Sequence, residues 1–409
     1  MADLVDKVDE VELSDSEEEN EEEVTEKKEE VMDLSNPDVV TKYKTAAGIT
    51  DKALQFVASQ CVDGASIIEI CNSGETVITG GLSAVYGKKV NGKAVDKGIA
   101  FPVCVSVNEI VSNNSPLSSE VQAPLKAGDI VKIDLGCHID GYIALAGHTF
   151  ICGEKADSVP KQVAPVVSDV ATAAYNAMLV AVSMIKEGGK GSEVTAAIQA
   201  VADAYEVNPL FKIRMTQMKR FVIEGPKEIA LRGPDVDAEE EKCKEAEFEK
   251  YEVYAIDVAM STGEGRVKEG EGRTTIYKKN VDKKFSLRMK ASRSLLNEIT
   301  KKSPTMPFSL RQFDEKSAKM GITELTVNNL VSAYPVLVEN KGVEVARFQT
   351  TVLILPSGPA KVTGMPMPAY FNSEKTLNEE AQTVLDALAA AEAKTLAKKL
   401  KKKSSKKKK

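Results

Sequence analysis

The stretch Gly128–Phe150, GDIVKIDLGCHIDGYIALAGHTF, is the most informative part of the chain. Its β-branched and aromatic residues predict two strands, Ile130–Leu135 and Tyr142–Cys152, separated by a glycine-bearing turn. The stretch also contains both histidines of the chain, His138 and His148. No later segment can therefore supply an imidazole ligand, which argues against most zinc sites and against Ser-His-Asp and Cys-His catalysis.

Length and composition predict an intracellular protein with a large core. The chain has 409 residues, of which 43% are hydrophobic, enough for one large domain or two to three ordinary ones. The N-terminus is acidic and no apolar run reaches the roughly 18 residues that span a bilayer, so we expect neither export nor a membrane partner. The six cysteines form no CxxC pair, which is typical of reduced structural thiols.

The two ends of the chain carry opposite charge, which the net charge of −7 conceals. Residues 1–36 are rich in carboxylates and contain no aromatic side chain, so we predict a disordered acidic tail. Residues 386–409 continue from the end of a last helix into a disordered lysine-rich tail, which is typical of nuclear addresses and phosphate-binding segments. The tail residues predicted to bind nucleic acid are Lys398, Lys399, Lys401, Lys402, Lys403, Lys406, Lys407, Lys408 and Lys409.

Between the tails, residues 37–385 combine helix-like and strand-like patterns. Apolar residues three and four positions apart predict helices over Val39–Val62, Ser66–Ser73, Ala164–Lys186, Gly191–Tyr205 and Asn372–Ala397. Apolar runs bounded by glycine and proline predict further strands over Ala100–Val107, Val253–Met260, Arg273–Tyr277 and Val345–Leu355. We therefore predict an α+β core in which long helices pack on a largely antiparallel sheet.

Several short motifs follow one another along this core in a specific order. They include GIAFP (Gly98–Pro102), SVN (Ser106–Asn108), GDIVKIDLG (Gly128–Gly136), YAID (Tyr254–Asp257), STGEG (Ser261–Gly265) and FQTTVLIL (Phe348–Leu355). Together they resemble type II methionine aminopeptidase and, still more closely, its non-enzymatic relatives, the proliferation-associated proteins that bind ribosomes and nucleic acid. The resemblance covers about Asn36 to Leu385. It implies the pita-bread fold, in which two pseudo-symmetric halves surround one sheet.

The resemblance also identifies the positions that hold two metal ions in the aminopeptidases. Those enzymes require two Asp, one His and two Glu ligands, and an upstream His that contacts the substrate. In this chain the ligand positions correspond to Asp134, Leu145, Thr216, Asp257 and Gln349, and the substrate position corresponds to Asn113. A dinuclear site needs several carboxylates to offset two cations, and only two remain. We therefore predict a pseudoenzyme with no catalytic residue, no bound metal and no cofactor.

A basic segment lies where the type II enzymes carry a helical insert, which here covers about residues 278–334. Its residues predicted to bind nucleic acid are Lys278, Lys279, Lys283, Lys284, Arg288, Lys290 and Arg293, followed by helix-like runs over Ser294–Lys302 and Ser309–Met320. A second basic patch contains Lys212, Arg214, Lys219 and Arg220. The plain alternative is that these are ordinary solvated faces. Few aromatic residues flank the runs, which favours recognition of RNA shape and phosphate over base stacking.

The sequence leaves three functions open. We favour a non-catalytic aminopeptidase-like protein that binds ribosomal RNA, the large ribosomal subunit or pre-ribosomal particles. The second hypothesis is a nuclear regulator of transcription or growth that binds DNA, ribonucleoprotein or regulatory proteins, because a lysine tail suits either polymer. The third is a divergent, active metallo-aminopeptidase. The tails predict a location in the cytoplasm and nucleus, including the nucleolus.

Overall fold

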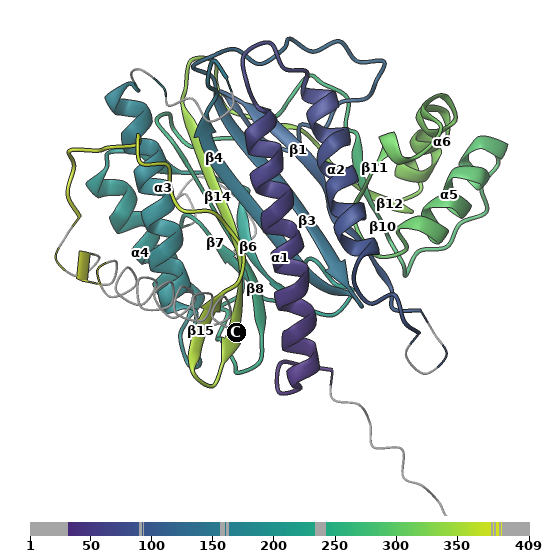
Figure 1. Ribbon diagram of the computed structural model, residues 1–409, viewed down its shortest axis with the longest axis horizontal. Coiled ribbons are helices and arrows are strands. Elements are labelled where there is room, and N and C mark those ends of the chain that lie inside the picture. Colours follow the sequence, from purple (N-terminus) through teal and green to yellow (C-terminus); the bar gives the residue numbers. More distant parts are fainter. Residues whose placement is uncertain are drawn as a thin grey trace, which may run out of the picture. The chain divides into compact units, whose positions relative to one another are not determined.

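The computed structural model describes residues 32–89, 92, 94–155, 160, 163–233, 243–377, 379, 382–383 and 386. These residues are organised around one nine-stranded sheet, whose main path follows the order β1-β3-β4-β14-β8-β6-β7. Figure 1 shows the long helices packed along this sheet and a smaller pair of helices beside it. The predicted α+β class, with an antiparallel sheet, is confirmed.

One half of the sheet consists of β1 (Lys97–Val107), β3 (Ile130–Ile139) and β4 (Tyr142–Ile151), covered by α1 (Pro37–Gln60) and α2 (Ile67–Ser83). Every residue of β3 and β4 is buried, which explains their nearly continuous apolar sequence. The turn between them has a positive φ at both of its residues, Asp140 (55°) and Gly141 (77°), as a type I′ hairpin turn requires.

Two elements of this half extend further than their sequence predicts, and glycine is the reason in both. Strand β3 continues through Gly136. The Leu145 side chain of β4 occupies the space of the missing Cβ, so glycine permits the two strands to pack closely here. Helix α2 continues past Ser73 through Gly74. A Cβ at Gly74 would lie 2.5 Å from Val57, so the missing side chain lets α2 pack closely on α1. Glycine normally weakens a helix or strand, but here it permits close packing.

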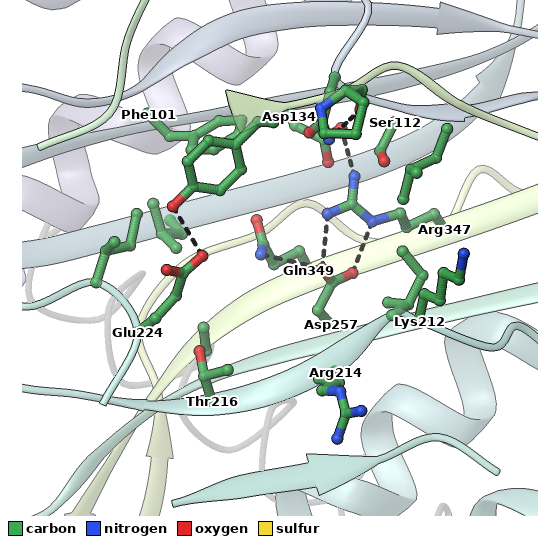
Figure 2. Close-up of a pocket in the computed structure, with 18 of the residues that line it drawn as sticks. Phe101, Ser112, Asp134, Lys212, Arg214, Thr216, Glu224, Asp257, Arg347 and Gln349 are labelled. Atoms are coloured by element: carbon green, nitrogen blue, oxygen red, sulfur yellow. Dashed lines mark hydrogen bonds and ion pairs between the residues drawn. The ribbon is translucent and has the colours of Figure 1, made fainter. Parts of the chain in front are cut away.

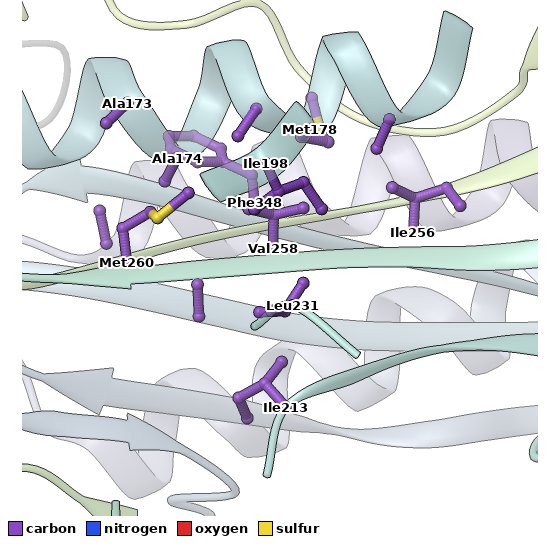
Figure 3. Close-up of a cluster of buried hydrophobic side chains, with 14 of the residues drawn as sticks. Ala173, Ala174, Met178, Ile198, Ile213, Leu231, Ile256, Val258, Met260 and Phe348 are labelled. Atoms are coloured by element: carbon purple, nitrogen blue, oxygen red, sulfur yellow. The ribbon is translucent and has the colours of Figure 1, made fainter. Parts of the chain in front are cut away.

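The other half consists of β6 (Arg214–Met218), β7 (Glu228–Ala230), β8 (Val253–Ser261) and β14 (Val345–Leu355), covered by α3 (Pro165–Met184) and α4 (Gly191–Ala204). Phe348 of β14 and Val258 of β8 meet small residues of α3, such as Ala174, in the core of this half (Figure 3). Helix α3 has the length and composition of a membrane span, but 61% of its apolar window is buried inside the protein. Its apolar character is explained by this packing.

The region predicted as a helical insert forms its own small layer beside the main sheet. Three strands, in the order β11-β10-β12, carry two helices and enclose a separate apolar cluster. The elements are β10 (Ile276–Lys279), α5 (Lys290–Lys302), β11 (Phe308–Ser309), the 3-10 turn η1 (Leu310–Gln312), α6 (Glu315–Val327) and β12 (Val331–Tyr334). The prediction of one helix-like run from Ser309 was wrong: α6 begins only after Asp314, whose carboxylate accepts from the Ser317 amide at 2.9 Å.

The remaining described strands are short. Strands β2 (Ile110–Ser112), β13 (Leu337–Val338) and β9 (Lys268–Glu269) form a third sheet, while β5 (Asn208–Pro209) and β15 (Gly358–Lys361) extend the main one. The strand predicted from Arg273 begins later, at Ile276. The final predicted helix is wrong over Asn372–Leu377, which is not helical, and most of the rest of it lies outside the described residues. The acidic tail up to Val31 and the lysines from Lys398 to Lys409 also lie outside them.

Candidate functional site

Four adjacent strands bring the two remaining carboxylates into one row. Asp134 of β3 is opposite Gly147 of β4, Gly147 is opposite Gln349 of β14, and Gln349 is opposite Asp257 of β8. Residues directly opposite each other in antiparallel strands point to the same face of a sheet. A Cβ at Gly147 would lie 2.9 Å from Asp134 Oδ1, so only glycine lets the row close around its centre.

Arg347 fills the centre of this row (Figure 2). It lies two residues before Gln349 on β14 and therefore points to the same face. Its Nε donates to Asp257 Oδ1 at 2.7 Å and its Nη2 donates to Asp257 Oδ2 at 2.6 Å. Its Nη1 lies 2.5 Å from Asp134 Oδ2, as an ion pair. One guanidinium thus joins carboxylates from β3 and β8, and these three side chains are at most 9% exposed.

Burial shifts the protonation of these charges. Complete burial raises the pKa of Asp134 to about 6, although Arg347 opposes the shift. Burial by itself would lower the pKa of Arg347, but Asp134 and Asp257 raise it, so the guanidinium stays charged. Lys132 is also completely buried, on β3, and burial lowers its pKa to about 7. The centre of the sheet is therefore a network of enclosed charges.

Asp134, Asp257, Arg347 and Gln349 form the floor of a cavity of about 400 Å³. Phe101 and Tyr334 line its wall, with their rings edge to face at 5.8 Å. The Tyr334 hydroxyl donates to Glu224 Oε1 at 2.8 Å, and Lys278 pairs with the same carboxylate. Because Ala333 and Tyr334 line the cavity and lie on β12, the insert itself forms one side of the cavity.

The donor set does not fit a pair of metal ions. Leu145 lines the cavity but has no donor atom, and Thr216 contributes only a neutral hydroxyl. Gln349 Nε2 donates to Asp257 Oδ2 at 3.3 Å, while Arg347 occupies three of the four carboxylate oxygens. Within the described ranges, no group of three or more His, Cys, Asp and Glu residues is arranged to hold a metal ion.

The substrate position and the two histidines have structural contacts. Asn113, with a φ of 66°, donates from Nδ2 to the carbonyl of Pro335 at 2.9 Å. His138 Nδ1 accepts from the Gly141 amide at 3.3 Å. His148 lies edge-on to Phe348 with ring centroids 5.2 Å apart. Each of these side chains therefore supports a turn, a loop or the core.

The cations predicted on the insert divide into two groups. Lys278 pairs with Glu224, Lys279 Nζ donates to Thr300 Oγ1 at 2.9 Å, and Arg293 Nη1 donates to two backbone carbonyls at 2.8 Å. The other four are exposed and have no side-chain partner within the part of the chain that the structure describes; these, called the insert cations below, are Lys283, Lys284, Arg288 and Lys290.

The second basic patch does not offer four free charges. Arg220 pairs with Asp140 at the hairpin turn, and Arg214 lies 3.5 Å from Glu228. Lys212 and Arg214 line the cavity, whereas Lys219 is exposed. These cations therefore belong to different local environments.

Sequence reasoning missed two kinds of residue here. Arg347 lay inside a strand with no motif to mark it, and its role depends on the register of strands far apart in the chain. Among the insert cations, Phe285 is 53% exposed and Val281 is 56% exposed. Isolated apolar residues are common on surfaces, but an exposed aromatic ring between lysines can stack on a base. The sequence FSLR contained this signal.

Comparisons with known proteins agree with this architecture. Metallopeptidase family M24 matches residues 41–225. Proliferation-associated protein A of Dictyostelium discoideum is 42% identical over 86% of this chain and 89% of its own length. ERBB-3 binding protein 1 of Solanum tuberosum is 43% identical over 87% of this chain and 88% of its own. The curved DNA-binding protein of Schizosaccharomyces pombe is 34% identical over 85% and 89%, respectively.

Solved structures show the same fold. A thermophilic Arx1 has a TM-score of 0.78 and 30% identity, covering 86% of this chain and 98% of that one. A methionine aminopeptidase from Thermotoga maritima has a TM-score of 0.51 and 19% identity, covering 82% of this chain and 100% of that one, and supports the fold alone. The predicted pita-bread fold is confirmed.

Proposed function

Because the chain belongs to the family of proliferation-associated proteins, which share the M24 metallopeptidase fold, we propose that it is a non-catalytic protein that binds structured RNA of ribosomes or pre-ribosomal particles. The observation that carries the proposal is the group of four exposed insert cations, for which the described residues provide no side-chain partner. The large ribosomal subunit, or a precursor of it, is the partner that this chemistry fits best, because its surface is dense in phosphate.

The non-catalytic part of the proposal rests on the centre of the sheet. Metal-dependent hydrolysis needs an open coordination position where water is activated. Here Arg347 donates to both oxygens of Asp257 and contacts Asp134, while the other ligand positions are Leu145, Thr216 and Gln349. The ordinary test is methionine release from a short peptide with added Co²⁺ or Mn²⁺. Turnover that Asp134→Ala abolishes would contradict this part of the proposal.

The backbone that carries the insert cations is anchored next to α5. Glu324 of α6 accepts from the amides of Arg288 at 2.7 Å and Met289 at 3.1 Å, immediately before α5 begins. Lys283 and Lys284 lie in the segment that leads to this point. An anchored backbone loses less entropy on binding than a free one and helps its charges to match phosphates of a folded RNA. Arrangement as well as charge therefore supports RNA binding.

The experiment is co-sedimentation with purified ribosomes across a salt series. We expect binding by the full chain to weaken with salt, and Lys283→Glu/Lys284→Glu to bind less and to reduce the salt slope by about 2. Lys278 and Lys279 are left intact, because they hold intramolecular contacts. The matched control is Lys44→Glu/Lys52→Glu, which makes the same charge change at exposed positions of α1.

A further variant separates the insert from the lysine tail. A chain ending at Ala393 lacks the tail lysines but keeps the insert cations. Retained, salt-sensitive binding would place recognition on the folded insert. If the insert variant and its α1 control lose ribosome binding equally, or if only removal of the tail abolishes binding, the interaction is nonspecific binding of a polyanion.

A second candidate function is DNA binding in the nucleus, which the name of the Schizosaccharomyces pombe relative favours. The same cations could contact duplex phosphates, since those contacts are independent of sequence. Competition between a folded rRNA fragment and a curved DNA duplex at one salt concentration separates the two. Preference for the duplex would replace the first proposal. For either polymer, we propose a protein of the cytoplasm and nucleus, which immunolocalisation tests directly.

A further inference from the structure

We infer that Arg347 permanently replaces the metal pair of this fold: its guanidinium, in place of divalent cations, holds Asp134 and Asp257 together and joins the two halves of the sheet. The inference concerns the folded core and is independent of RNA binding. It rests on the contacts of Arg347, on the weak pairing between β4 and β14, and on the burial of the charges involved.

The boundary between the two halves has little backbone ladder pairing within the described sheet. Strand β14 pairs with β4 only at Gln349 and Gly147, whereas it pairs with β8 along its length from Val345 to Leu353. A boundary with so little ladder pairing needs other bonds to hold it. The side chains of the flanking strands must therefore provide much of the connection.

Threonine hydroxyls bridge part of this boundary. The Arg347 amide donates to Thr149 Oγ1 at 2.8 Å, and the same hydroxyl donates to the Arg347 carbonyl at 2.6 Å. The Leu145 amide donates to Thr351 Oγ1 at 2.8 Å, and that hydroxyl donates back to the Leu145 carbonyl at 3.0 Å. Two threonines thus replace ladder bonds on either side of the carboxylate row. The backbone of Arg347 is itself held at the boundary.

The guanidinium completes the connection with charge. It reaches from β14 to Asp134 on β3 and to Asp257 on β8, so it spans the boundary in the plane of the row. One positive charge stands between two negative charges, and none of the three side chains is more than 9% exposed. Metal ions would have to displace a bidentate ion pair, which is among the strongest hydrogen-bonded contacts in proteins. The carboxylates are therefore kept as partners of Arg347.

This explanation differs from simple loss of the metal ligands. If Asp134 and Asp257 were unused remnants, replacing them with Asn would lower stability little. Replacing Arg347 would then lower stability only through the lost packing of its side chain. If they are the counter-ions of Arg347, removing the arginine leaves two buried, unpaired carboxylates. Replacing both carboxylates with Asn in the chain that lacks Arg347 should then recover stability. A buried ion pair, or uncharged side chains in its place, destabilises a protein less than a buried charge without its partner.

The experiment compares the melting temperatures of full-length variants with and without millimolar Mn²⁺. We expect Arg347→Met to melt roughly 6 °C or more below the unaltered chain, and Mn²⁺ to restore part of the loss, because a cation can again enter between the carboxylates. We expect Arg347→Met/Asp134→Asn/Asp257→Asn to melt above the single variant and to be insensitive to Mn²⁺. The unaltered chain should also be insensitive.

The chain provides a matched control in Arg311, another buried arginine, which pairs with the single carboxylate of Glu75. Arg311→Met should lose stability without responding to Mn²⁺. If Arg347→Met does not fold at all, folding of the triple variant would support the inference and its failure to fold would contradict it. Stabilisation of the unaltered chain by Mn²⁺ that Asp134→Asn removes, or an Arg347→Met variant as stable as the parent, would also overturn it.

Discussion

Cations are placed in opposite ways at the centre of the sheet and on the insert. Arg347 is only 8% exposed on its side chain and is enclosed by two carboxylates. The insert cations, such as Lys283 and Lys284, are exposed and have no side-chain partner among the described residues. A buried charge must be paired because desolvation is costly, while an exposed charge remains available to a ligand. The core cation thus stabilises the fold, and the insert cations provide a binding surface.

The largest expected difference between these regions is in stability. Asp257→Ala removes both acceptors of the Arg347 bidentate pair and should lower the free energy of unfolding by about 4 kcal/mol. Lys284→Glu changes an exposed charge and should alter it by less than about 0.5 kcal/mol. Denaturant unfolding of the two variants measures both values. Similar losses would mean that the contrast between the regions has no energetic basis.

The next largest effect is expected in the pH dependence of stability, where buried His148 should contribute and the exposed insert cations should not. Burial lowers the pKa of His148 to about 4 from the ordinary 6.5. The folded state therefore binds this proton less readily than the unfolded chain, so the stability due to neutral His148 is complete above pH 6.5. About 3 kcal/mol of it should be lost as the pH falls from 6.5 to about 4.

The measurement is the free energy of unfolding at pH 7 and pH 4.5, for the parent chain and for His148→Gln. The variant should lose less stability on acidification than the parent. Only the difference between the two chains reports on His148, because the raised pKa of Asp134 acts in the opposite direction over this pH range. Parallel losses in both chains would rule out the titration of His148.

A smaller effect is expected where the insert joins the core. Arg311 of η1 pairs with Glu75 of α2 and donates to Ser115 Oγ at 2.6 Å. Glu75→Gln weakens this buried contact and should cost about 2 kcal/mol. Glu298→Gln is the control, because Glu298 meets Lys302 at the exposed surface of α5, at 3.6 Å. It should cost less than about 0.5 kcal/mol.

Hydrogen exchange adds a local measurement for the same pair. If the Arg311 contact anchors the insert, the amides of α5 and α6 should exchange faster in Glu75→Gln than in Glu298→Gln. Unchanged exchange in both would mean that the apolar cluster beneath the helices holds the insert without this ion pair.

The smallest expected effect concerns Phe285 on the insert. If its exposed ring stacks on a base, Phe285→Ala should lower affinity for a folded rRNA fragment about fivefold, or about 1 kcal/mol. Val327→Ala removes an apolar side chain that is 75% exposed at the end of α6, and should leave the affinity unchanged. Fluorescence anisotropy measures both. If Phe285→Ala binds as well as the parent, the RNA is recognised through phosphate contacts alone, as the scarcity of aromatic residues around the basic runs predicts.

Continuous apolar patterns predicted the core elements well. The strand predicted over Val345–Leu355 has the observed bounds of β14, because its burial is nearly continuous. Glycine caused the larger errors. The prediction for α2 ended at Ser73, before Gly74, although that glycine lies where α2 packs closely on α1 and β1. A local helix penalty is visible in a sequence, whereas the close packing that offsets it is a tertiary feature.

The sequence by itself determined which groups this chain has for chemistry: two histidines, the carboxylates Asp134 and Asp257, and Leu145, Thr216 and Gln349 at the other ligand positions. It also determined the order of the long core elements α1, β3, β4, α3, α4, β8 and β14, because periodicity is local. Only the tertiary structure decided that Arg347 lies between the two carboxylates, and which cations of the insert find no partner among the residues that the structure describes. Strand register and ion pairing join residues far apart in the chain, so no local pattern specifies them.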